Sequence, residues 1–100
     1  MIFNIDEKII LIASLEEFHA KKAAPVFRRS AEFIDDMRCT CLNKLEHLSI
    51  LTYFTKQEYT VMCVALNDVI QKLLIADYEV PDGYYELFDK LETLADPDET

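Results

Sequence analysis

The stretch that most constrains the fold is residues 55–76, TKQEYTVMCVALNDVIQKLLIA, which predicts one long α-helix. Thr55 stands three residues before Glu58, the capping-box spacing in which each side chain accepts a hydrogen bond from the other residue's backbone N–H. Apolar side chains then recur at steps of three and four, and no Gly or Pro interrupts them. This stripe comprises Tyr59, Met62, Leu66, Val69, Leu73 and Ala76, and it is widened by Cys63 and Ile70. The sequence therefore predicts a core helix here.

Composition favours one domain built from few, long elements. The 100 residues are 51% apolar, which is enough for a single hydrophobic core. One Gly and three Pro supply too few turns for a β-sandwich or a β-barrel. We expect one helical domain over residues 1–95, followed by a frayed acidic tail over residues 96–100.

Two more long helices are predicted before this stretch. A capping box at Asn4 begins a helix over residues 5–22. Pro25 then breaks the helical pattern. A second helix follows over residues 26–48, unless Ser30 caps a helix that begins only there.

The last helix is short, over residues 84–95, and Asp82 is its predicted cap after a loop that contains Pro81 and Gly83. The predicted fold class is therefore all-α. We expect a small antiparallel helical bundle of four helices, three long and one short, or alternatively two αα-hairpins.

An internal similarity is compatible with the two-hairpin arrangement. Residues 3–18 align with residues 54–69, and residues 42–48 align with residues 88–94. The matched positions include Phe3 with Phe54, Glu7 with Glu58, Leu15 with Leu66, and Lys44 with Lys90. Convergence is the alternative to duplication, because amphipathic helices resemble one another.

The sequence favours a cytoplasmic protein that does not enter a membrane. Its longest apolar runs, residues 9–13 and 61–66, are far shorter than the roughly 20 residues that span a bilayer. The first residues, MIFNIDEK, lack the basic start of a secretory signal. An odd number of cysteines, Cys39, Cys41 and Cys63, indicates reduced thiols. We expect Cys41 and Cys63 to be buried and Cys39 to be more exposed.

Negative charge is concentrated in the second half of the chain. Residues 1–50 carry seven Lys/Arg and eight Asp/Glu, whereas residues 51–100 carry three and eleven. Residues 77–100 alone hold nine acids against the single base Lys90. Repulsion from phosphates argues against DNA or RNA as the main ligand, so the charge favours a basic protein partner.

Tyrosines within this acidic segment indicate a contact surface, because amphipathic rings among carboxylates suit protein interfaces. We predict a non-enzymatic interaction protein that binds a basic protein partner. Small inhibitors and chaperones are similar in size and charge. The predicted partner-binding residues are Tyr78, Glu79, Asp82, Tyr84, Tyr85 and Glu86, together with Val64 on the polar side of the long helix.

The predicted helix over residues 5–22 is apolar on every side near its start, which a surface helix does not tolerate. We therefore expect this helix to be central in the fold or covered by a second subunit in a homodimer. The predicted self-association residues are Ile9, Ile10, Leu11 and Ile12.

A metal-dependent nucleotide hydrolase is one alternative function. Acidic pairs on two helices can hold Mg²⁺, and the residues for such a site would be Glu16, Glu17, Asp35 and Asp36. Glu16 and His19 also have the spacing of half a di-iron site, but the sequence lacks a second pair. We therefore expect no metal, no cofactor and no catalytic residue.

A nucleic-acid-linked regulator is the other alternative. It would use the basic elbow, which we define as Lys21, Lys22, Arg28 and Arg29. The elbow would contact an anion or an acidic partner. A helix-turn-helix is not supported, since no joint between the predicted helices carries a Gly turn followed by a basic helix.

Overall fold

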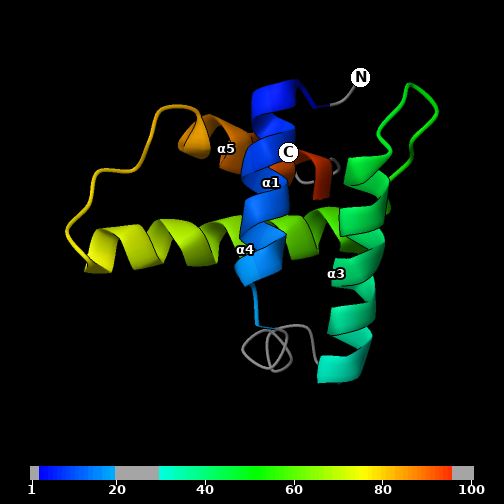
Figure 1. Ribbon diagram of the computed structural model, residues 1–100, viewed down its shortest axis with the longest axis horizontal. Coiled ribbons are helices and arrows are strands. Elements are labelled where there is room, and N and C mark those ends of the chain that lie inside the picture. Colours follow the sequence, from blue (N-terminus) through cyan, green and yellow to red (C-terminus); the bar gives the residue numbers. More distant parts are fainter. Residues whose placement is uncertain (1–2, 20–29, 96–100) are drawn as a thin grey trace.

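The computed structural model describes residues 3–19 and 30–95 (Figure 1). Within these ranges the chain forms four α-helices and no strands, so the predicted all-α class is confirmed. The helices are α1 (Ile5–Glu17), α3 (Ala31–Glu46), α4 (Lys56–Ile75) and α5 (Tyr84–Ala95). The predicted tail over residues 96–100 lies outside the described residues.

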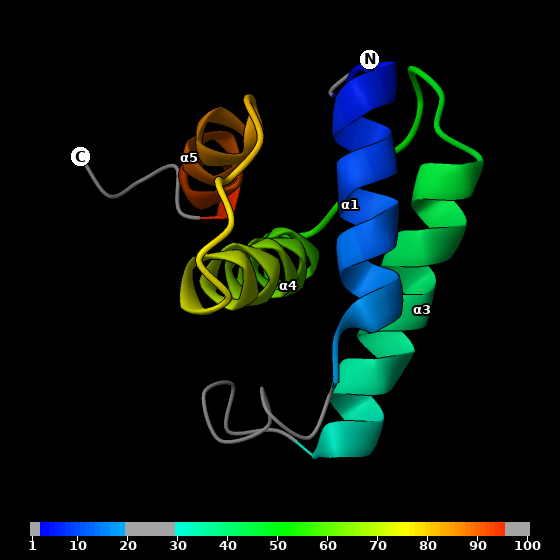
Figure 2. The same cartoon turned by 60° about the vertical axis from the view of Figure 1, so that its left-hand side comes forward.

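The four helices form two antiparallel hairpins that cross each other. Figure 2 shows α1 and α3 side by side and running in opposite directions. In Figure 1, α4 and α5 are likewise antiparallel, and α1 crosses α4 steeply. α4 packs against all three other helices and is therefore the central element. Of the two predictions made for α1, a central position is thus wrong, and coverage by a second subunit stays a prediction. The Cα radius of gyration, 13.0 Å, is that of a compact domain of this length.

The capping boxes begin α1 and α4 as predicted. Asn4 Oδ1 accepts from the Glu7 N–H at 2.8 Å, and Glu7 Oε1 accepts from the Asn4 N–H at 2.9 Å. At α4 the corresponding distances between Thr55 and Glu58 are 3.1 and 2.7 Å. Ser30 caps α3 by accepting a hydrogen bond into its first turn, so α3 begins at Ala31 and the alternative start was the right one.

The predicted helix over residues 5–22 is too long, because α1 ends at Glu17. Phe18 leaves the helical conformation with φ −73° and ψ 131°, and its side chain is buried in the core. The Leu15 carbonyl at this end accepts from the Phe18 N–H and from the Arg38 guanidinium at 3.1 Å. Burial of Phe18 and a cation from α3 therefore stabilise this end, which has no basic residue of its own.

α4 ends in a Schellman motif. Asp77 adopts a positive φ of 63°, its N–H donates to the Leu74 carbonyl at 3.1 Å, and the Tyr78 N–H donates to the Leu73 carbonyl at 2.9 Å. This motif turns the chain out of α4 and presents the following loop to solvent.

α5 begins directly after Gly83, which has a φ of 92°. The Gly83 carbonyl accepts the Leu87 N–H at 3.0 Å, the first hydrogen bond of the helix. Gly83 therefore occupies the N-cap position that we had predicted for Asp82, because only glycine adopts this backbone conformation without strain.

A single core joins the four helices. The buried face of α4 includes the predicted Tyr59, Met62, Leu66 and Ile70, while Ala76 at the end of the stripe is exposed. The other helices contribute fewer fully buried side chains, among them Leu11, Leu15, Ile34, Cys41, Leu45, Leu87 and Leu91. Long α4 thus supplies the platform on which both hairpins pack.

Candidate functional site

The candidate site is the tyrosine-acid surface, which we define as residues 77–86, the loop after α4 and the first turn of α5. The side chains of Tyr78 and Tyr85 are 67% and 51% exposed. Four exposed carboxylates lie between and beside these rings. They are Asp77, Glu79, Asp82 and Glu86, and none of them has a side-chain hydrogen bond or ion pair with another described residue.

Both ends of this surface are fixed by the backbone. The Schellman motif at Asp77 holds one end, and the turn at Gly83 holds the other. Val80 and Tyr84 are half-buried and pack against the core between these ends. Tyr84, which the sequence named as a contact residue, therefore anchors the surface and offers only part of its side chain to a partner.

Val64, the other predicted contact residue, is half-buried against the core on α4 and offers only part of its side chain to solvent. Its neighbours Cys63 and Ala65 also belong to the packed side of α4. The polar positions nearby misled the sequence prediction, because α4 is covered on more than one face.

The chemistry of the tyrosine-acid surface suits cations. Hydrated carboxylates attract Lys and Arg, and an exposed phenol ring accepts a guanidinium on its face. Several acids elsewhere are instead engaged in ion pairs, which neutralise part of their charge. The described pairs are Glu7 with Lys90 (3.2 Å), Asp35 with Arg38 (2.9 Å), Glu58 with Lys44 (2.8 Å) and Asp68 with Lys72 (3.0 Å).

The predicted self-association face of α1 is only partly exposed. Ile9 is 59% exposed, Ile10 and Ile12 are half-buried, and Leu11 is completely buried in the core. Leu11 therefore cannot contact a partner, because its side chain points into its own chain. The sequence missed Ile5, which is exposed one turn before Ile9 and could have been found from that spacing.

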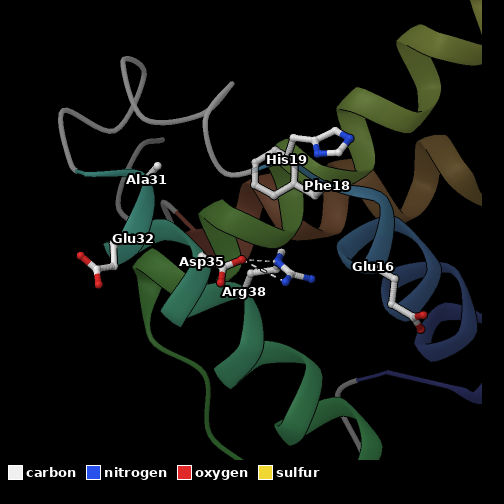
Figure 3. A pocket seen from close by; sticks show the side chains of 7 residues that line it. All are labelled: Glu16, Phe18, His19, Ala31, Glu32, Asp35 and Arg38. Carbon is white, nitrogen blue, oxygen red and sulfur yellow. Dashed lines mark hydrogen bonds and ion pairs between the residues drawn. The ribbon is translucent and has the colours of Figure 1, made fainter.

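The acidic pairs of the hydrolase hypothesis do not gather around one point. Glu16 and Asp35 line an open hollow with Arg38, but Asp35 is paired with Arg38 at 2.9 Å and Glu16 points away from that pair (Figure 3). Glu17 and Asp36 are exposed and do not line the hollow. Among residues 3–19 and 30–95, no group of three or more His, Cys, Asp or Glu is placed to hold a metal ion.

The cysteines are free thiols with different surroundings. Cys41 is buried, and burial raises its thiol pKa to about 12. Cys63 is half-buried, and burial raises its pKa to about 11. Both thiols are therefore protonated at neutral pH and unsuited to nucleophilic catalysis. Cys39 is exposed, as predicted.

The basic elbow, Lys21, Lys22, Arg28 and Arg29, lies outside the described residues, so the nucleic-acid hypothesis stays a prediction. A second group of exposed residues lies before α4, and two of its members, Ile50 and Leu51, were not anticipated from the sequence. Ile50, Leu51 and Tyr53 protrude from the segment between α3 and α4.

The fold and the site define a small acidic all-α protein with a solvent-exposed tyrosine-acid surface. No protein-family model, no curated protein and no solved structure matches this chain. None of the helices in the described ranges is long and apolar enough to cross a membrane.

Proposed function

We propose that this chain is a non-enzymatic interaction protein that binds a basic protein partner through the tyrosine-acid surface, in the manner of an inhibitor or a chaperone. One observation carries the proposal: within residues 77–86, two exposed tyrosines stand among four exposed carboxylates that have no side-chain partner among the described residues. Free thiols in all three cysteines fit a reducing compartment, and we place the interaction in the cytoplasm.

Charge and ring chemistry have separate roles in this proposal. The net charge of −9 accelerates the approach of a basic partner over long range. Rigid tyrosine rings then supply contact area at a low cost in side-chain entropy. Since a ring face binds guanidinium better than it binds a compact ammonium, the surface favours arginine-rich segments over lysine-rich ones.

Calorimetric titration with a deca-arginine peptide tests the proposal. The test variant replaces Asp77, Glu79, Asp82 and Glu86 by their amides, and we expect its affinity to fall at least about tenfold. A matched control replaces four exposed acids outside the surface and so removes the same charge. These control positions are Glu16, Glu17, Asp36 and Glu46.

We expect the control to lose less than about threefold, because only its long-range attraction changes. Equal losses in the two variants would show that net charge alone acts, and the proposed surface would then be wrong. The rings are tested by Tyr78→Ser with Tyr85→Ser, against Tyr53→Ser as a control at an equally exposed ring. Undiminished binding of the first variant would exclude the tyrosines.

A further inference from the structure

The two hairpins contact each other through one set of interactions that occurs twice. We call α1 with α3 hairpin one, including Phe3 just before α1, and α4 with α5 hairpin two, including Phe54 just before α4. In the first set, Lys44 of hairpin one reaches across to hairpin two. Its Nζ lies 2.8 Å from Glu58 Oε1 and 5.5 Å from the centre of the Phe54 ring.

The second set runs in the opposite direction. Lys90 of hairpin two reaches across to hairpin one, where its Nζ lies 3.2 Å from Glu7 Oε1 and 5.1 Å from the centre of the Phe3 ring. Glu7 is the capping-box acid of α1, just as Glu58 is the capping-box acid of α4. Each hairpin therefore offers the same three groups: an aromatic ring, a capping glutamate and a lysine.

The sequence similarity connects the same positions. The alignment that places Phe3 on Phe54 also places Glu7 on Glu58, and the second alignment places Lys44 on Lys90. The two equivalent rings, Phe3 and Phe54, contact each other with their centroids 5.9 Å apart. Other equivalent positions are buried in both hairpins: Leu11 and Met62, Leu15 and Leu66, Cys41 and Leu87, Leu45 and Leu91.

This reciprocity is the signature of an isologous interface, in which residue i contacts residue j and j contacts i. In this structure both sides of the interface belong to one chain. Hairpin two of a second molecule offers the same groups as hairpin two of the chain itself, so it fits hairpin one equally well. We propose that this chain pairs with a second copy of itself by exchanging hairpins. This inference goes beyond the proposed function and does not depend on it.

The hinge for the exchange is residues 47–53, which lead from α3 to Phe54 at the start of hairpin two. Two of its large apolar side chains, Ile50 and Leu51, are not used in the single chain, since they are 84% and 88% exposed, whereas Leu48 packs against the core. The hydrogen bonds within the hinge are local and involve Ser49, Leu51 and Thr52. The Tyr53 carbonyl also accepts from Lys44 Nζ of α3 at 2.8 Å. Opening the hinge therefore breaks few hydrogen bonds, and two hinges side by side in the exchanged dimer would bury Ile50 and Leu51.

Reciprocal charge reversal in two full-length chains tests the exchange. One chain carries Glu7→Lys and the other carries Lys90→Glu, so each alone holds two like charges across the interface. In an exchanged dimer of one copy of each, both contacts again join opposite charges. After the isotope-labelled mixture is unfolded and refolded, native mass spectrometry should show at least about tenfold more dimer than either variant alone, and this dimer should be mixed.

The control pair is Asp68→Lys with Lys72→Glu, because both residues lie on α4 and exchange cannot bring them together across chains. No mixed dimer of the test variants, or as much mixed dimer in the control, overturns the proposal. The substitution Ile9→Glu separates this mode from pairing through the α1 face, since it should leave the exchanged dimer intact.

A deletion variant keeps the test decisive if the charge variants do not fold. Deleting residues 49–52 removes four of the nine residues between Glu46 and Lys56, and strained short hinges favour exchange. We expect this chain to be a folded helical dimer by light scattering and circular dichroism. If it is monomeric, whether folded or unfolded, the hairpins do not exchange.

Discussion

The ion pair between Lys44 and Glu58 should stabilise the fold more than the other described pairs do. Glu58 Oε1 accepts from Lys44 Nζ at 2.8 Å and from the Thr55 N–H at 2.7 Å, and the Glu58 side chain is only 6% exposed. The same Nζ donates to the Tyr53 carbonyl at 2.8 Å. One lysine thus joins the hinge, the start of α4 and the end of α3.

The expected energy follows from the exposure of each pair. A charge-assisted hydrogen bond to a buried group contributes about 2 kcal/mol, and we expect a coupling of this size between Lys44 and Glu58. The pair between Asp68 and Lys72 is 3.0 Å long but more exposed, at 23% and 44%, and lies along one helix. Its coupling should be about 0.4 kcal/mol.

Urea unfolding of two double-mutant cycles measures both couplings. The first cycle combines Lys44→Met with Glu58→Gln, which keep the side-chain volume and leave an amide oxygen to accept from Thr55. The second combines Asp68→Asn with Lys72→Met. If the two coupling energies are equal within error, burial does not strengthen the first pair and the reasoning from exposure is refuted.

Three further predictions concern single residues. With Ellman's reagent at neutral pH, one thiol per folded chain should react rapidly, and Cys39→Ser should remove that phase, because Cys39 is exposed. Rapid reaction of all three thiols would contradict the packing. Raised thiol pKa values make the unfolded state lose these two protons first. The thiols' contribution to stability should therefore be constant below about pH 9 and fall as the pH rises towards about 12 for Cys41 and about 11 for Cys63, by about 1.4 kcal/mol per pH unit for each thiol. Urea titrations across this range check the slope, and Cys41→Ala should reduce it. Asp77→Gly, at a φ of 63°, should raise the free energy of unfolding by about 0.7 kcal/mol, whereas Gly83→Ala, at a φ of 92°, should lower it by about 1 kcal/mol. Changes of the opposite sign would contradict the assigned backbone conformations.

Local signals in the sequence were enough to predict most of the fold. The capping boxes at Asn4 and Thr55 and the cap at Ser30 are read within one turn of chain, so their positions agree with the structure. The end of α1 is different, because it depends on the burial of Phe18 and on Arg38 from another helix. Neither interaction is visible in the spacing of nearby residues.

The candidate site was predictable in its chemistry but not in its exposure. Composition alone located the acidic tyrosine segment, because nine acids and one base mark residues 77–100. Which apolar side chains reach solvent depends on how the hairpins cross. Leu11 was therefore misplaced on the surface, while Ile5 and Leu51 were not recognised as exposed.

Mapping by nuclear magnetic resonance tests the proposed interaction surface most directly. The isotope-labelled chain is titrated with the deca-arginine peptide while its backbone amide shifts are followed. We expect the largest changes within residues 77–86 and at the adjoining end of α4, with little change on α3. Changes spread evenly over exposed acids such as Glu17, Asp36 and Glu46, or no change at all, would contradict binding at the tyrosine-acid surface.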